Sequence, residues 1–139
     1  MAKLYPFEVH TPYRLFYSGS VEGIILTLSD GEIGVFADHS YFTAPVVPSL
    51  LKIKDNQGLW QTAFVSNGIL EVKNHKTVLM VDSAEWPNEI DCGRALTAKK
   101  AAEEVLESRM FKFETLSARE KLRRAEIRLK VAELQKKPE

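Results

Sequence analysis

The sequence has 139 residues, and its 19 Lys and Arg balance 19 Asp and Glu, so the formal net charge is zero. Hydrophobic residues make up 45% and charged residues 27%, which excludes a disordered or collagen-like chain. The single cysteine, Cys92, excludes an intrachain disulfide or a cysteine-based zinc site. Because no signal peptide or apolar run near the ~18 residues of a membrane span is present, we expect a soluble protein in a reducing compartment.

The neutral total conceals a division along the chain. Residues 1–88 carry a net charge of −3, whereas residues 89–139 carry +3. Six of the seven glycines lie at or before Gly68, and no proline occurs between Pro87 and Pro138. A turn-rich segment followed by a charged, proline-free one predicts strands first and helices second. We place the boundary between the two domains after residue 86.

In the first segment, short apolar runs alternate with turn signals. They predict eight strands, at residues 4–9, 13–17, 20–28, 41–47, 50–54, 59–66, 69–73 and 76–82. The run 51–54 alternates apolar and charged residues, as a half-buried strand does. Asn67-Gly68 predicts a hairpin turn, because both residues tolerate positive φ. Strands that recur every eight to twelve residues predict a β-sandwich or a barrel.

The second segment predicts two helices. Asp91 caps the first, and a narrow stripe of small residues follows it at helical spacing: Ala95, Ala98, Ala102 and Val105. Residues 108–113 are expected to form the turn. Ser117 to Glu120 matches a capping box for the second helix, although this helix could begin a few residues earlier. It should run to about Lys136, and the short connection implies an antiparallel hairpin.

The second helix has two apolar stripes on opposite sides. One comprises Ala118, Leu122, Ala125, Leu129 and Ala132 and should pack on the first helix. The other comprises Ile127, Val131 and Leu134. Arg124 and Arg128 lie one turn apart between them. Either the helix is wedged between its partner helix and the β domain, or the second stripe serves another protein or a second docking state of the hairpin.

Signals for catalysis or nucleic-acid binding are weak. His10, His39 and His75 belong to no metal-ligand or catalytic motif. Asp38-His39 permits an acid–base hypothesis, but a polar loop is the better interpretation. Glu32, between two glycines, is either a contact residue or a surface carboxylate. Glutamates interrupt the basic run 119–130, so we expect a solvated helix face and no nucleic-acid partner.

Five motifs in a fixed order indicate a family. They are Thr11-Pro12; Asp30-Gly31-Glu32-Ile33-Gly34-Val35 with His39 after it; Ser66-Asn67-Gly68-Ile69-Leu70-Glu71-Val72; Ile90-Asp91-Cys92-Gly93-Arg94-Ala95; and Leu122-Arg123-Arg124-Ala125. In order and spacing they resemble the epsilon subunit of bacterial and chloroplast F-type ATP synthases. Two positions depart from that pattern. Ala37-Asp38 stands where the family usually has Pro-Gly, and Asn67 replaces the first hairpin glycine.

The resemblance implies an α+β fold: a β-sandwich of two five-stranded sheets (1–86), then a C-terminal antiparallel helical hairpin (87–139). It also implies a non-catalytic rotor subunit of a proton-translocating ATP synthase. The sandwich would bind the gamma subunit and the ring of c subunits. The extended hairpin would reach the alpha and beta subunits and inhibit ATP hydrolysis. The chain would lie at the cytoplasmic face of the bacterial plasma membrane, or the stromal face of the thylakoid, held there by the complex.

The resemblance also implies site residues. Glu32 and His39 would contact the c-ring or gamma, and Arg123, Arg124 and Arg128 would form the inhibitory basic helix. No cofactor or metal is required, but regulatory ATP could bind to a set of five residues: Glu85, Asp91, Arg94, Arg124 and Arg128. The simpler alternative is that Asp91 is only a helix cap paired with Arg94. Two other functions remain open, a free-standing ATP-sensing regulator and a small hydrolase that uses Asp38-His39.

Overall fold

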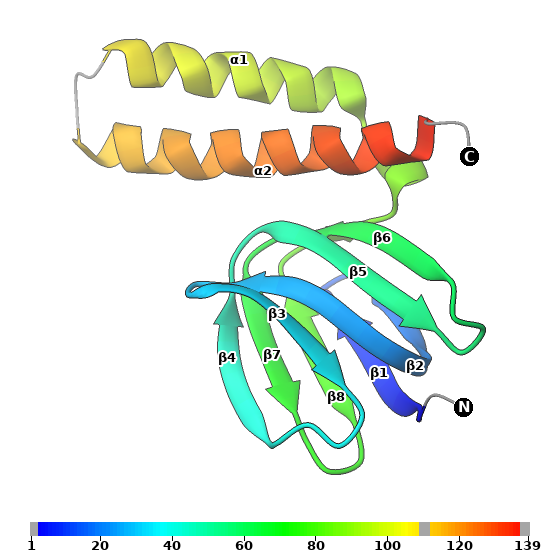
Figure 1. Ribbon diagram of the computed structural model, residues 1–139. Helices are drawn as coiled ribbons and strands as arrows, with labels where there is room; N and C mark the ends of the chain where they lie inside the picture. The colour runs from blue at the N-terminus through cyan, green and yellow to red at the C-terminus, as the bar shows by residue number, and fades with distance from the viewer. Residues whose placement is uncertain (1–2, 109–111, 137–139) are drawn as a thin grey trace. The chain divides into compact units, whose positions relative to one another are not determined.

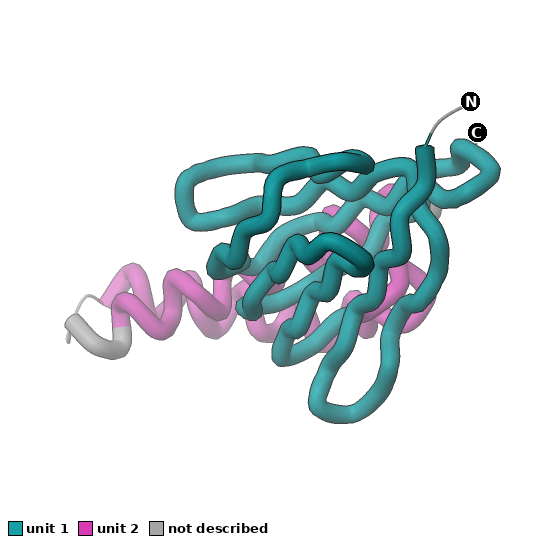
Figure 2. Tube along the Cα trace, turned by 90° about the horizontal axis from the view of Figure 1, so that it is seen from below, with its two compact units in different colours: residues 1–84 teal, residues 85–139 magenta. Residues whose placement is uncertain are grey.

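The computed structural model describes the backbone of residues 3–108 and 112–136, and the side chains of residues 3–108 and 115–134 (Figure 1). The chain divides into two compact units, residues 1–84 and residues 85–139, drawn in teal and magenta in Figure 2. The first contains almost all of the β-structure, and the second contains both α-helices.

Nine strands occur in the described part of the chain. They are β1 (Tyr5–His10), β2 (Leu15–Leu28), β3 (Gly31–Phe36), β4 (Phe42–Val46), β5 (Ser49–Asp55), β6 (Trp60–Val65), β7 (Gly68–Val72), β8 (Thr77–Val81) and β9 (Ala84–Glu85). β9 spans the boundary between the two units and pairs with β6.

The long strand β2 belongs to both layers of the sandwich (Figure 1). Its first half pairs with β1, in a layer that continues through β8 and β7 to β4. Its second half pairs with β3 and β5, in a layer that continues through β6 to β9. Each layer therefore has five strands when β2 is counted twice. The predicted sandwich is confirmed, but its layers are joined into one hydrogen-bonded sheet rather than separate.

The core follows the period-two alternation of the strands. Phe7 and Val9 on β1 are fully buried. Leu51 and Ile53 on β5 are buried as well, whereas Lys52 and Lys54 are half-buried, so the alternation predicted for 51–54 is confirmed. Apolar side chains from both layers thus meet between them, which is the main stabilising contribution in a sandwich.

Three predictions about the strands are wrong. Residues 13–17 and 20–28 do not form two strands, because Ser18-Gly19-Ser20 stays extended by pairing with β1. Residues 31–36, where no strand is predicted, form β3, since the turn at Gly31 (φ 133°) lets the chain fold back onto β2. Asn67-Gly68 is not a hairpin turn: β6 and β7 lie in different layers, and neither residue has positive φ.

The second unit contains a short 3-10 helix, η1 (Pro87–Glu89), and two helices, α1 (Cys92–Ser108) and α2 (Lys112–Lys136). Asp91 caps α1 as predicted: its Oδ1 accepts the Arg94 N–H at 3.0 Å. Ser117 is not a cap, because α2 begins five residues earlier. The expected turn at 108–113 includes residues 109–111, which lie outside the described residues.

The contact between the two helices is made of small residues. The two helices pack together, and alanines from both are buried: Ala95, Ala102, Ala118, Ala125 and Ala132. Ala98, predicted to lie in this seam, is exposed, because the seam on α1 runs through half-buried Lys99 instead. On the second stripe of α2, Val131 is buried, whereas Leu134 is exposed.

Gly68 is required by close packing rather than by its φ. A Cβ atom built there would lie 2.0 Å from the backbone oxygen of Met80 on the neighbouring strand. We expect Gly68→Ala to lower the free energy of unfolding by about 2–3 kcal/mol, since the backbone of β8 has to move. Urea denaturation measures this. At Gly19 the nearest atom is the hydroxyl at the end of the Tyr17 side chain, at 3.3 Å, so Gly19→Ala should change stability by less than about 1 kcal/mol. Equal losses in both variants would contradict this explanation.

Candidate functional site: the surfaces of the sandwich and the basic hairpin

The motif that carries Glu32 and His39 does not form a single loop in the structure. Glu32 is the second residue of β3, paired with Thr27, and His39 follows the other end of that strand. At a strand rise of about 3.3 Å per residue, Glu32 and Phe36 alone are ~13 Å apart. Both Glu32 and His39 are exposed. They are therefore two separate exposed side chains near opposite ends of β3.

The loop that carries His39 keeps the backbone shape of a glycine. Asp38 has φ 64°, in the left-handed region, which costs a non-glycine residue about 1 kcal/mol. This is the position where the resembled family has glycine. The Asp38 carboxylate is tied to Lys3, whose Nζ lies 2.9 and 3.0 Å from its two oxygens. The departure from the family pattern thus leaves the backbone turn in place and adds an ion pair.

His39 and Asp38 contact different partners. The Nδ1 of His39 donates to the Ser40 carbonyl oxygen at 3.1 Å, and its ring lies 5.1 Å from the ring of Phe42. Asp38 is engaged with Lys3 instead. The acid–base hypothesis needs a carboxylate that orients the imidazole, and this geometry does not supply one.

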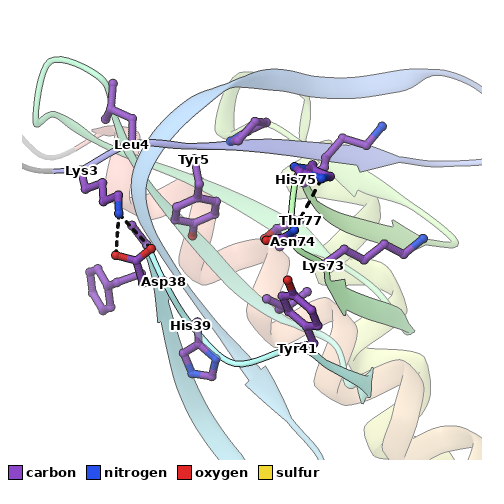
Figure 3. A pocket seen from close by; sticks show the side chains of 15 residues that line it. Lys3, Leu4, Tyr5, Asp38, His39, Tyr41, Lys73, Asn74, His75 and Thr77 are labelled. Carbon is purple, nitrogen blue, oxygen red and sulfur yellow. Dashed lines mark hydrogen bonds and ion pairs between the residues drawn. The ribbon is translucent and has the colours of Figure 1, made fainter.

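An open hollow of about 510 Å³ lies beside this loop, bounded by residues 3–6, the loop after β3 and the β7–β8 turn (Figure 3). Tyr5 and Tyr41 face it, and the Lys3–Asp38 pair lies at one side. The Tyr5 hydroxyl donates to the Val35 carbonyl oxygen at 2.6 Å, and burial raises the pKa of Tyr5. Tyr5 therefore remains protonated and ties β1 to β3.

A row of outward-facing side chains crosses the layer β4–β7–β8–β1–β2. In the strand register, each of these residues is paired with the next one on the neighbouring strand. We call them the outer row: Pro45, Ile69, Met80, His10 and Leu15. Ile69, Met80 and Leu15 are 45%, 41% and 54% exposed. The sequence analysis did not identify this surface. Alternation marks each side chain as outward-facing, but the row depends on a strand order in which β1 and β8 are parallel neighbours.

In the hairpin unit, the structure brings two of the candidate ATP residues together. The Arg128 Nε lies 2.6 Å from the Glu85 Oε1, and both side chains are largely shielded from solvent. Arg124 lies one turn earlier on α2 and is half-buried. Asp91 binds the backbone N–H of Arg94 rather than its guanidinium. Arg123 and Arg94 are exposed.

Metal-binding groups and membrane-spanning helices are absent from the described ranges, 3–108 and 112–136. No group of three or more His, Cys, Asp or Glu side chains there is arranged to hold a metal ion. Within those same ranges, neither helix is both long and apolar enough to span a bilayer.

Comparisons with known proteins assign the family. The family described as ATP synthase, delta/epsilon chain, beta-sandwich domain matches residues 5–87, and its long alpha-helix domain matches residues 88–133. The ATP synthase epsilon chain of Caldanaerobacter subterraneus is 44% identical over 133 residues, 95% of this chain and 96% of that relative. The epsilon chain of Caldicellulosiruptor bescii is 43% identical over 93% of both chains.

Solved structures share the fold at low identity. A chain of the Euglena gracilis mitochondrial ATP synthase superposes with a TM-score of 0.80 at 19% identity, covering 94% of this chain and 81% of that one. A central-stalk/c-ring structure of the Tetrahymena thermophila mitochondrial ATP synthase contains a chain with a TM-score of 0.61 at 11% identity, covering 94% and 97%.

A β-sandwich followed by a two-helix unit is the architecture of the delta/epsilon chains of ATP synthases, which are non-catalytic subunits. The chain belongs to the ATP synthase delta/epsilon chain family, in which it is a bacterial-type epsilon subunit of the F-type central stalk.

Proposed function

We propose that this chain couples rotation of the c-ring to ATP synthesis, and that the outer row of the sandwich is its docking surface for the gamma subunit. The observation that carries this proposal is the row itself, because four of its five side chains are apolar and exposed. Exposed apolar side chains gathered on one face of a protein mark an interaction surface. Methionine and aliphatic side chains of this kind form the core of protein interfaces.

Contact with the c-ring is assigned to Glu32 and His39, each on its own. Glu32 follows the tight turn at Gly31, where a partner backbone can approach closely. Its carboxylate can accept hydrogen bonds from that partner. His39 presents an exposed imidazole whose Nδ1 is already satisfied, so its Nε2 remains to meet a partner.

The hairpin is proposed as the inhibitory element, which extends toward the alpha and beta subunits. Its interhelical seam buries mainly alanines, and each buried methyl contributes only about 0.8 kcal/mol. A small contact of this kind is suited to exchanging partners. The cations Arg123, Arg124 and Arg128 lie along α2, where they would favour acidic surfaces of the catalytic subunits.

Regulatory ATP is a second proposal, favoured by the Glu85–Arg128 pair. A triphosphate would replace the Glu85 carboxylate as the partner of Arg128, and Arg124, one turn away, would provide a second guanidinium. Glu85 would then be free to accept from the adenine amino group or a ribose hydroxyl. ATP at a hundredfold excess over Kd would stabilise the folded hairpin by about 2.7 kcal/mol.

These partners also determine where the chain resides. As a central-stalk subunit held between gamma and the c-ring, it would be peripheral to the cytoplasmic face of the bacterial plasma membrane. A free-standing ATP-sensing regulator is the less favoured alternative, because relatives that match nearly the whole chain are ATP synthase subunits.

The docking surface predicts a charge-sensitive interface. Met80→Glu places a carboxylate in the centre of the outer row, and we expect affinity for the cognate gamma subunit to fall about thirtyfold, or ~2 kcal/mol. Surface plasmon resonance with the full chain measures it. Asn56→Glu, which adds the same charge in the β5–β6 turn, is the matched control and should bind as the wild type does. Equal affinity for Met80→Glu and the control would exclude this face.

The separation of Glu32 from His39 predicts additive effects on coupling. Glu32→Ala and His39→Ala should each fold normally and reduce proton-coupled ATP synthesis in the reconstituted complex. When the two losses in synthesis rate are converted to free energies, they should add to within about 0.5 kcal/mol in the double variant. The reason is that sites more than 7–10 Å apart act independently. Synthesis at the wild-type rate in both single variants would rule out these contacts.

Removal of residues 89–139 should release inhibition. The sandwich supplies its own buried core, so the truncated chain should still bind the complex while ATP hydrolysis rises. The triple variant Arg123→Ala, Arg124→Ala, Arg128→Ala should reproduce part of this rise, and its effect should be larger at low salt, where screening is weaker. The rate of ATP hydrolysis by the assembled enzyme is the readout. A truncated subunit that still inhibits fully would show that the hairpin is not the inhibitory element.

The ATP site is decided by isothermal titration of the full chain. Wild type should release heat at millimolar ATP or below, whereas the Arg124→Ala/Arg128→Ala variant should not. Arg119→Ala, an exposed arginine on the same helix, serves as the control and should titrate normally. Absence of binding by the wild type would refute the site without affecting the stalk proposal.

A further inference from the structure

His10 is the one polar member of the outer row and lies between two apolar members. In the strand register its neighbours on the two sides are Met80 on β8 and Leu15 on β2, both exposed and apolar. The remaining members, Pro45 and Ile69, do not titrate. The charge of the whole row therefore depends on one imidazole.

The imidazole shares a carboxylate oxygen with a lysine. The Glu8 Oε1 lies 2.8 Å from the His10 Nε2 and 3.3 Å from the Lys76 Nζ. The hydrogen bond from His10, followed by the contact with Lys76, holds the pKa of Glu8 below its ordinary value, so Glu8 is anionic near neutral pH. When His10 is neutral, the trio of Glu8, His10 and Lys76 has no net charge. With protonated His10 it carries +1.

Charged groups on the neighbouring strands have contacts of their own. On β7, Glu71 lies in the adjacent outward row but is paired with Lys73 at 3.0 Å. Beside Leu15, the guanidinium of Arg14 lies over the Phe16 ring, 5.1 Å from its centroid. Neither group adds a carboxylate that faces the imidazole.

We infer that protonation of His10 weakens docking at the outer row, which makes the proposed gamma contact sensitive to pH. The inference rests on the docking surface proposed above. Docking against an apolar partner removes His10 from water, and this costs more for the charged form than for the neutral one. Histidine is the side chain whose ordinary titration falls between pH 5 and 8.

The test compares affinity of the full chain for the cognate gamma subunit at pH 8 and pH 6, at constant salt. Wild-type affinity should fall about threefold to fourfold at pH 6, since one proton on an ordinary imidazole can change binding by no more than this. His10→Gln, which cannot become charged, should bind equally at both values. His75→Gln, which removes an exposed histidine in the β7–β8 turn, should keep the wild-type pH dependence.

A second variant tests the same trio without removing the imidazole. Glu8→Gln deletes the partner that favours protonated His10, so the pH of half-maximal binding should move downward. Circular dichroism at both pH values confirms that each variant is folded. Equal wild-type affinity at pH 8 and 6, tighter binding at pH 6, or an unchanged pH dependence in His10→Gln would overturn the inference. No binding at either pH would overturn the docking surface itself, and this inference with it.

Discussion

The sandwich depends on one strand that hydrogen-bonds in two layers. β2 is 14 residues long and pairs with β1 through its first half and with β3 and β5 through its second. Its end also meets β4, where Leu28 is paired with Val46. Because the strand is shared, the two layers are joined by backbone hydrogen bonds along one continuous strand. β1, which pairs with the first half of β2, also pairs in parallel with β8, and this pairing brings His10 beside Met80 in the outer row.

The hairpin unit is stabilised in a different way. The sandwich buries large side chains such as Phe7 and Phe64 completely, whereas the seam between α1 and α2 buries mainly alanines. Alanine permits close approach of two helices but removes little apolar surface from water. The Glu85–Arg128 pair adds a polar tie in the same unit. A unit of this composition is suited to regulation, since its contacts are replaceable by those of a partner or a nucleotide.

Particular elements show where sequence-based prediction succeeded and failed. Asp91 was identified as a cap because its side chain and the N–H it satisfies are three residues apart. Asn67-Gly68 was misread because its dipeptide favours a hairpin, whereas the chain there crosses between layers and needs glycine to avoid the Met80 oxygen. Strand β3 was missed because Gly31 and Gly34 weaken its β propensity, and only pairing with β2 makes it a strand.

The sequence by itself determined the division into strands and helices, the helical cap, the family and the residues that carry charge. These follow from local chemistry and from motifs that are contiguous in the chain. Only the tertiary structure decided that Glu32 and His39 lie at opposite ends of β3, that Arg128 meets Glu85, and that His10 separates Met80 from Leu15. Each of these depends on strand order or on contacts between residues distant in sequence, and strand order is set by how the whole core packs, not by any one segment.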